Sequence, residues 1–389
     1  MNPSTEISAP VGQASGIIPQ EPSSRGLKGG AFQRTAGNDG TMGNYNVPDS
    51  IPSLSYFAFI SAMRPFVRLV ARGRLTAVCY HRVIQENDAR FHGYKPTINA
   101  SREAFSRQID YLQANYDLIS LSDLIAWVDG RQTLPPRPAL VTFDDGYRDN
   151  AEVAWPIMRA RGVPAVIFLA TDYIGTGRPF IWDVAAYLFA STAQASANVP
   201  LIGLRKLETE ADRDTATAAW VDAVKRLPGT KRNEAVAGLA KALRVDIPGQ
   251  DVFRHLYMDW DDVRRLAHEG VEFGGHTCSH PILTGISEPQ SRREIEESIR
   301  QVTEAIGCKT LGFAYPNGSR RDYSDRHEDA VIKCGVPLAF SLEPGPMRLS
   351  EVSKHRTSIR RIYVGAHEPL PRFVAKLSGA ARFAHVLRR

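Results

Sequence analysis

The chain has 389 residues, of which 43% are hydrophobic and 23% charged. These are ordinary values for one large globular domain or two small ones, so they exclude a fibrous or wholly disordered protein. Lys and Arg total 48 against 42 Asp and Glu, a net charge of +6. This mild excess suits acidic polysaccharide or lipid headgroups. The chain has no block of like charges, zinc-finger spacing or RNA-binding aromatic motif, so we expect no nucleic acid partner.

The cysteine pattern and the first residues bear on the compartment. Four cysteines are scattered singly without a C-x-x-C pair, so neither a disulfide framework nor a cysteine-based zinc site is expected. The first residues lack the cationic and apolar regions of a secretory signal. The apolar stretch at residues 51–63 is shorter than the roughly 20 residues that a bilayer span needs. A cytoplasmic location is therefore predicted.

The N-terminal part differs in composition from the rest of the chain. Residues 1–50 are rich in Gly, Ser, Pro and Asn and poor in large apolar residues, which predicts a disordered tail. Residues 51–74 are apolar with interspersed Arg, which predicts an N-terminal helix packed on the following domain. A helix on a membrane surface is the alternative, so peripheral membrane contact stays open here and at the basic C-terminal end.

From residue 75, short apolar or β-branched runs alternate with helical patterns, which is typical of parallel βα units. Candidate strands are residues 76–80, 139–143, 164–169, 271–274, 310–314 and 337–340. Candidate helices are residues 102–115, 122–128, 150–161, 259–269, 289–307 and 324–334. Residues 172–256 show no convincing strand, and residues 208–242 among them are charged and rich in Ala, so a helical insertion is expected here. The pattern predicts an α/β fold, either a barrel or a doubly wound sheet.

Two adjacent carboxylates follow a candidate strand in the segment LVTFDDGYRDN. Asp144 and Asp145 would stand at the carboxyl end of this strand, the edge at which active sites form in βα folds. Neighbouring side chains on extended backbone point different ways, which would suit one carboxylate on a metal and the other free as a base. The alternative is a strand-end turn in which Asp caps the next helix.

Two histidines follow another apolar strand end, in VEFGGHTCSHP. Being four residues apart, His276 and His280 can fall on one side of a helical turn and reach one divalent ion. With Asp145 they would form a facial His-His-carboxylate set, open to water and substrate. Two hydrogen-bonding histidines without a metal are the alternative.

Three further segments carry candidate groups. In LGFAYPNG, the turn at Tyr315, Pro316 and Gly318 could present backbone N–H groups to an oxyanion, or could be a simple turn. In AVCYHRV, His81 ends the first candidate strand and could protonate a departing amine, or could be a core histidine. Trp182 opens the insertion, where it could stack on a sugar ring or anchor the insertion core.

Together these segments resemble the polysaccharide deacetylase family, also called carbohydrate esterase family 4 or the NodB homology domain. TFDDG, HTCSH and YPNG match its first motif, its second and most of its third, in that order. The resemblance implies a distorted (β/α)7 barrel, a divalent ion such as zinc, and hydrolysis of acetyl groups on glycans. By position it implies Asp144 as general base, Asp145, His276 and His280 as metal ligands, and the backbone N–H of Tyr315 as oxyanion donor.

The chain departs from the family pattern at two points. The third motif usually begins with Arg, but Ala314 stands there, and Arg360 or Arg361 could supply the missing cation from a neighbouring strand. The family's late motifs, which carry a Trp and a catalytic His, are not recognisable after residue 340. A branch that acts on poly-N-acetylglucosamine has a Tyr-His motif on its first strand. YHRV at residues 80–83 resembles it, which implies His81 as the catalytic acid.

The sequence thus predicts a metal-dependent hydrolase that removes N-acetyl groups from a glycan of the chitooligosaccharide or poly-N-acetylglucosamine type. The acetylated glycan is its expected partner, and residues 75–380 its expected domain. Two alternatives remain open. One is a non-catalytic glycan-binding protein on the same fold. The other is a hydrolase of a different carbon–nitrogen bond, such as that of a cyclic imide or ureide.

Overall fold

The structure is a computed structural model that describes residues 62, 64–84, 93–227 and 229–379. All of them belong to one compact unit, Asn46–Arg389. The predicted tail and most of the predicted helix at residues 51–74 lie outside the described residues. Residues 64–71 are helical, and Val67 and Ala71 are buried there. Arg64 donates a hydrogen bond to the Asn115 side chain, so this helical segment packs on the domain.

A nine-stranded sheet forms the centre of the unit. Its strands run in the order β11 (Leu338–Phe340), β10 (Gly312–Ala314), β9 (Glu272–Gly275), β6 (Val166–Leu169), β5 (Pro138–Asp145), β1 (Arg74–Tyr80) and β12 (Met347–Arg348), with β13 (Ile362–Tyr363) also on β1 and β4 (Asp117–Leu118) on β5. Neighbours are parallel except β12, which is antiparallel to β1. All six predicted strands are present.

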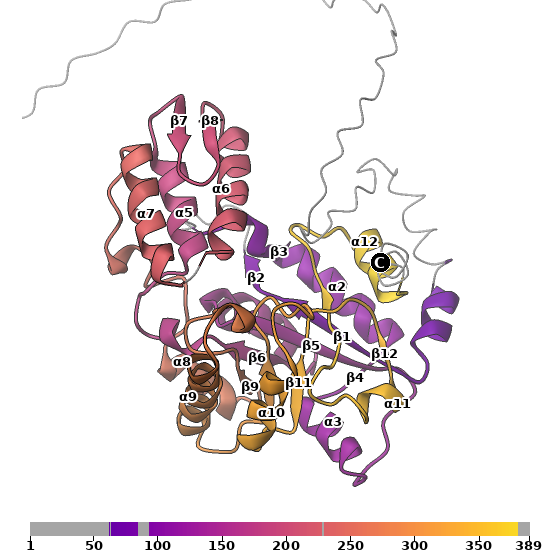
Figure 1. Ribbon diagram of the computed structural model, residues 1–389. Helices are drawn as coiled ribbons and strands as arrows, with labels where there is room; N and C mark the ends of the chain where they lie inside the picture. The colour runs from indigo at the N-terminus through magenta and orange to yellow at the C-terminus, as the bar shows by residue number, and fades with distance from the viewer. Residues whose placement is uncertain (1–61, 63, 85–92, 228, 380–389) are drawn as a thin grey trace, which may run out of the picture. The chain divides into compact units, whose positions relative to one another are not determined.

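The sheet curls into a half-barrel (Figure 1). The fold is therefore of the predicted α/β class. Its two sides are linked through the segment before β13, because Ile359 bridges Phe340 of β11 while Ile362 pairs with Val78 of β1. Strand β5 lies in the middle and is buried along its whole length. The carboxyl ends of the parallel strands therefore meet around one edge.

Helices surround the outside of this sheet (Figure 1). They are α2 (Arg102–Asn115), α3 (Leu121–Val128), a π-helical turn η2 (Asn150–Ala154) leading into α4 (Trp155–Arg159), α8 (Trp260–His268), α9 (Glu288–Ile306), α10 (Asp325–Lys333), α11 (Leu349–Val352) and α12 (Leu370–Leu377). Local capping explains several of their starts. Capping boxes formed by Ser120 with Asp123 and by Asp259 with Asp262 open α3 and α8, and α9 ends at Gly307 in the left-handed region.

The insertion forms a lobe with its own apolar core, which includes the fully buried Trp220. It contains α5 (Ile181–Ser191), α6 (Glu210–Lys225) and α7 (Gly229–Leu243). The expectation of helices alone was wrong, because β7 (Ser196–Val199) and β8 (Gly203–Lys206) form an antiparallel hairpin between α5 and α6.

Short elements complete the chain. They are β2 (Arg82–Ile84), which pairs with β3 (Ile98–Ser101), and the 3-10 turns η1 (Lys95–Thr97), η3 (Thr171–Tyr173), η4 (Gln250–Val252) and η5 (Leu283–Gly285). Over the described part of the chain, no helix combines the length and the apolar character needed to cross a membrane.

Candidate active site

The two adjacent carboxylates stand at the carboxyl end of β5, as predicted, and both are buried. Asp145 has a left-handed backbone with φ 76°, which turns the chain between the two side chains. Gly146 follows with φ 84°, and a Cβ there would lie 2.7 Å from Ile174 Cδ1. Only glycine fits this turn without displacing the core, so the D-D-G sequence has a local structural reason.

The two histidines follow β9, next to β6 and β10. The backbone N–H of His276 donates to Leu169 O at 2.9 Å. Its Nδ1 lies 2.7 Å from the carbonyl oxygen of Ala314, which leaves Nε2 as the nitrogen facing the carboxylates. His280 has φ 54°, so the loop between the histidines leaves the extended conformation and turns the second imidazole towards the first. Their ring centroids are 4.8 Å apart.

A glutamate on α9 holds this loop. Glu294 Oε2 accepts the backbone N–H groups of Cys278 at 2.9 Å and Ser279 at 2.8 Å. Its other oxygen accepts the Ser279 hydroxyl at 2.6 Å. Glu294 was not predicted as a site residue, because it lies in a helix rich in charged residues and no motif distinguishes it from its exposed neighbours. Cys278 itself is buried, and its thiol lies 3.7 Å from the carbonyl oxygen of Glu294, on the α9 side of the loop.

Three of these side chains form a group that could hold a metal ion. The ligand atoms of Asp145, His276 and His280 all lie within 4.8 Å of one another. Nε2 of His276 and Nε2 of His280 are 3.7 Å and 3.5 Å from Asp145 Oδ1. That oxygen is buried and has no hydrogen-bond partner among the described residues. Such an orphaned carboxylate oxygen facing two imidazoles fits a divalent cation.

The electrostatics of the three residues agree with that fit. Burial and the charge of Asp144 raise the pKa of Asp145 well above its ordinary value, which a cation would reverse. Burial lowers the pKa of both His276 and His280. The imidazoles are therefore neutral near pH 7, the form that ligates metal. Nitrogen and oxygen ligands in this number suit zinc.

Asp144 lies next to this set, with its Oδ2 3.9 Å from Nε2 of His276, and is paired with an arginine. Arg361 donates to its two carboxylate oxygens at 2.6 and 2.8 Å, and both residues are fully buried. Burial alone would raise the pKa of Asp144, but the charge of Arg361 outweighs it and holds the pKa well below the usual range. Of the two arginines that could replace the missing cation, Arg361 is therefore the one that contacts Asp144. Arg360 instead pairs with Glu351.

His81 lies on the other side of the carboxylates, directly after β1. Its Nε2 is 3.9 Å from Asp145 Oδ2, and the side chain is 14% exposed. Its backbone N–H donates to the side-chain oxygen of Asn99, and its carbonyl accepts from Asn150 at 2.8 Å. Burial lowers the pKa of His81 to about 4. The structure therefore brings His81 to the metal group, held by Asn99, a residue that the sequence analysis missed.

The turn after β10 differs from the expectation in one respect. The backbone N–H of Tyr315 donates to Phe340 O at 3.0 Å, as part of the pairing with β11, so it is not free to bind an oxyanion. The N–H of Asn317, two residues on, has no acceptor among the described residues. Pro316 O accepts from Gly318 at 2.7 Å. A Cβ on Gly318 would lie 2.6 Å from Leu342 N, so this tight turn needs glycine.

Trp182 lies beside the metal group but does not offer an open face to a sugar. Its ring is 5.2 Å from that of His280 and stacks on Phe180 at 4.3 Å. Its Nε1 donates to the Tyr147 hydroxyl, and only 6% of the residue is exposed. The proposed stacking on a pyranose is therefore wrong for this conformation, because the ring is covered. Trp182 packs against His280 instead.

The buried carboxylate of Asp183 anchors this aromatic group. Asp183 accepts from the hydroxyls of Tyr147 at 3.0 Å and Tyr257 at 2.6 Å, and from the backbone N–H of Tyr94 at 2.7 Å. Burial raises the pKa of Asp183, although these bonds favour its ionised form. The network joins the start of α5 to the segments flanking the sheet, so it fixes the insertion against the site.

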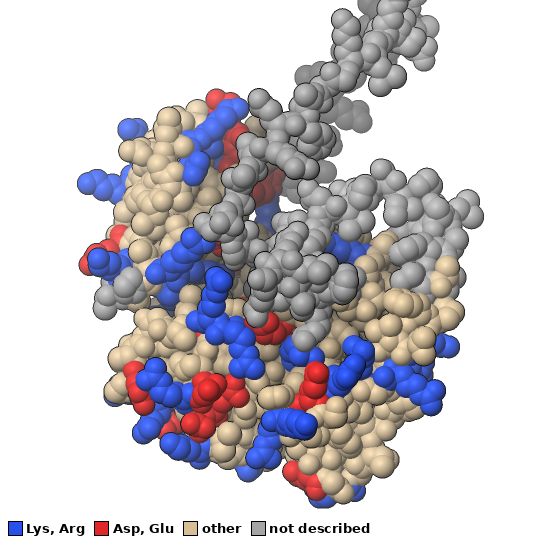
Figure 2. Space-filling model, turned by 45° about the vertical axis from the view of Figure 1, so that its right-hand side comes forward, with Lys and Arg blue, Asp and Glu red and all other residues tan. Residues whose placement is uncertain are grey.

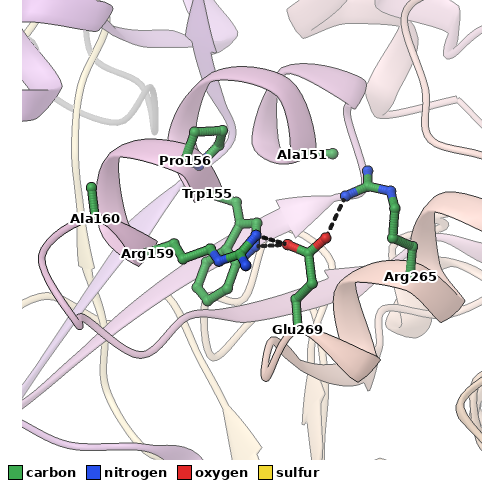
Figure 3. Close-up of a pocket in the computed structure, with 7 residues that line it drawn as sticks. All are labelled: Ala151, Trp155, Pro156, Arg159, Ala160, Arg265 and Glu269. Carbon is green, nitrogen blue, oxygen red and sulfur yellow. Dashed lines mark hydrogen bonds and ion pairs between the residues drawn. The ribbon is translucent and has the colours of Figure 1, made fainter.

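A surface pocket of about 500 Å³ lies elsewhere, between α4 and α8 (Figure 3). Its central carboxylate, Glu269, accepts from Trp155 Nε1 at 2.7 Å. Glu269 also pairs with Arg159 and Arg265, both at 3.1 Å. These groups neutralise one another, and none belongs to the metal group. We therefore place the candidate active site at the sheet edge and not in this pocket.

Comparison with known proteins gives one family match and several matches to solved structures. The family model for polysaccharide deacetylase matches residues 131–339, a range that contains the carboxylate pair, the histidine pair and the turn after β10. A curated relative, YxkH of Bacillus subtilis, is named for the same family and is 19% identical over 232 residues. The match covers 56% of this chain and 54% of that relative, so the chain spans about half of the relative's length.

Solved structures share the fold. IcaB from Ammonifex degensii superposes with a TM-score of 0.50 at 19% identity, covering 78% of this chain and 97% of that one. The Streptococcus pyogenes deacetylase PplD, solved with acetate, gives a TM-score of 0.50 at 13% identity, covering 78% and 98%. A de-N-acetylase from Aggregatibacter actinomycetemcomitans also gives 0.50, at 16% identity, covering 78% and 99%.

Proposed function

Since this chain belongs to the polysaccharide deacetylase family, we propose that it hydrolyses N-acetyl groups on an amino-sugar glycan with a divalent metal ion, zinc for preference. One observation carries the proposal. An ionised carboxylate, Asp144, is held by Arg361 directly beside the group formed by Asp145, His276 and His280. An ionised carboxylate next to a three-ligand set is what metal-assisted amide hydrolysis needs.

The reaction assigns a role to each group. A divalent ion on the three ligands would acidify a water and polarise the acetamide carbonyl. Asp144 accepts a proton from the attacking water as its oxygen bonds to the carbonyl carbon. The N–H of Asn317 replaces that of Tyr315 as our candidate donor to the oxyanion. When the C–N bond breaks, His81 is our candidate to pass the proton taken from the water on to the amine nitrogen, and acetate leaves.

Two observations support N-deacetylation over the alternatives. Arg361 contacts Asp144, so the cation missing from the third motif is replaced, which removes the main reason to expect a non-catalytic glycan-binding protein. His81 lies 3.9 Å from Asp145, as expected if the YHRV segment takes the place of the late family histidine. We therefore propose that the chain belongs to the Tyr-His branch and that its substrate is of the chitooligosaccharide or poly-N-acetylglucosamine type. The similar Aggregatibacter protein is a de-N-acetylase, which favours the same bond.

The test is acetate release by the purified full chain. Protein stripped with chelator and protein reloaded with zinc are incubated with chitopentaose, poly-N-acetylglucosamine and acetylated xylan, and separately with a cyclic imide and a cyclic ureide. We expect acetate from an N-acetylated glycan only after reloading, with about one bound metal per chain by elemental analysis. Glycan binding without acetate release would favour the glycan-binding alternative. Ring opening of a cyclic imide or ureide, in place of acetate release, would favour the other hydrolase.

A further inference from the structure

The insertion brings a positive charge to the metal group. Lys225 is the last residue of α6, and its ammonium nitrogen lies 4.9 Å from the centroid of the Trp182 ring. That ring in turn is 5.2 Å from the ring of His280. Because α5 carries Trp182 and α6 carries Lys225, the packing of these two helices sets the position of the ammonium relative to the metal ligands.

Lys225 has no carboxylate partner among the described residues, and its ammonium lies over the ring of Trp182. Burial lowers the pKa of Lys225, and among nearby acids the charge of Asp145 does most to raise that pKa again. Asp145 belongs to the metal group, however, so a bound cation would claim its charge. A half-buried ammonium without an anion is costly. The other acids whose charges act on Lys225, Asp222 and Asp322, form no ion pair with it among the described residues, so its ammonium remains available to an anionic ligand.

Arg232, on α7, adds a second positive charge and orders the end of α6. Its Nη2 donates to Lys225 O at 2.9 Å and its Nε to Leu227 O at 3.2 Å. Both acceptors are backbone carbonyls, so these bonds leave the charge of Arg232 without a carboxylate partner in the described part of the chain. Figure 2 shows Lys and Arg side chains gathered on the face where the insertion adjoins the barrel.

We propose that Lys225, supported by the charge of Arg232, forms a subsite for an anionic substituent, a carboxylate or a phosphate, on the glycan. The subsite rests on the proposed deacetylation and adds to it a preference for glycans that carry an acidic group next to the N-acetylated sugar. Trp182, which touches both His280 and Lys225, fixes the spacing between the metal group and the ammonium. An acidic sugar beside the N-acetylated one would place its anion there, while the acetamide reaches the metal.

Two matched substrate pairs test this subsite. The first is a heparosan tetrasaccharide, in which glucuronic acid alternates with N-acetylglucosamine, against the same compound with its carboxylates reduced to alcohols. The second is chitobiose with and without a 6-phosphate. We compare kcat/KM for acetate release among four proteins: the wild type, Lys225→Met, Lys225→Arg and Lys241→Met. Lys241 is an exposed lysine on α7 of the same insertion and serves as the control.

We expect the wild type to prefer the acidic member of at least one pair, and the preferred pair identifies the anion. Lys225→Met should lower kcat/KM on that acidic substrate about tenfold, the effect of one charge-assisted hydrogen bond. For the neutral member of the pair, the kcat/KM of Lys225→Met should stay within about twofold of the wild-type value. Lys225→Arg should restore the preference, Lys241→Met should behave as the wild type, and added salt should weaken the preference.

The subsite is wrong if Lys225→Met lowers kcat/KM equally for both members of each substrate pair, or for neither member. It is also wrong if the wild type shows no preference for an acidic member. These results leave the deacetylase itself intact, because acetate is still released. Acetate release from none of the four compounds by the zinc-loaded wild type would instead overturn the deacetylase proposal, and the subsite with it. Metal content measured on every variant shows that the active site has formed.

Discussion

The edge of the sheet and the insertion meet at one site, but they contribute different things to it. The sheet supplies Asp144 and His276 from strand ends that are wholly buried and held by backbone hydrogen bonds. The insertion supplies Trp182 and Lys225 from helices of a separate lobe. A rigid, buried edge suits groups that must hold a metal and a proton at fixed positions. A lobe attached beside it can change the substrate without disturbing the chemistry.

The sharpest test of this division uses the two adjacent carboxylates of β5. Asp144→Asn should lower kcat by about 10²- to 10⁴-fold, because it removes the base, while bound metal stays at the wild-type level. Asp145→Asn is the matched variant, and it should lose both metal and activity because it removes a ligand. Acetate release and metal content are measured on both. If Asp144→Asn also lost the metal, the separation into base and ligand would be wrong.

The buried ion pair behind the base should matter for stability as well. Arg361→Met leaves Asp144 as a buried carboxylate without its partner, so we expect about 3–5 kcal/mol less free energy of unfolding at pH 7. Urea unfolding followed by circular dichroism measures this difference.

Arg360→Met is the control for that experiment. Arg360 pairs with Glu351, whose side chain is 41% exposed, and such a pair should cost about 0–1 kcal/mol. Equal losses in the two variants would show that Asp144 does not depend on Arg361 for its charge.

The sheet side of the site could be predicted because its signals are local. An apolar run followed at once by Asp144 and Asp145 marks a strand end, and the histidine pair repeats that pattern after β9. The contact between Arg361 and Asp144 joins residues 217 apart in sequence. Which of the two neighbouring arginines faces inward depends on the pairing of Ile362 with Val78, which a two-residue strand does not reveal.

The insertion side could not be predicted to the same depth. Strand β8 is mostly exposed, so the hairpin lacks the apolar alternation that indicates a strand. Lys225 and Glu294 both lie in charged helices, where a functional side chain looks like any solvated one. The prediction that the Tyr315 N–H binds an oxyanion was wrong for a related reason. Its acceptor, the carbonyl oxygen of Phe340, belongs to a strand 25 residues away. Contacts between distant segments decide all these positions.

A smaller effect is expected from the residue that holds the histidine loop. Glu294→Gln keeps the shape of the side chain but weakens its bonds to the backbone N–H groups of Cys278 and Ser279. We expect about a tenfold weaker zinc affinity, as for other partners that orient ligands, measured by competition with a fluorescent chelator. Glu296→Gln, at an exposed position on the same helix, should leave the affinity unchanged. Unchanged affinity in Glu294→Gln would mean that the loop holds its shape alone.

The smallest effect should come from the insertion residue nearest the metal group. Trp182→Phe keeps an aromatic ring on Phe180 but removes the hydrogen bond from Nε1 to the Tyr147 hydroxyl. Tyr147 still has Asp183 as a partner, so we expect a stability loss of only about 1 kcal/mol by thermal unfolding. Zinc affinity should stay at the wild-type value, because His280 is positioned by its own loop. A marked loss of zinc would show instead that the insertion takes part in holding the metal, and the division of the site into a chemical edge and a selective lobe would have to be abandoned.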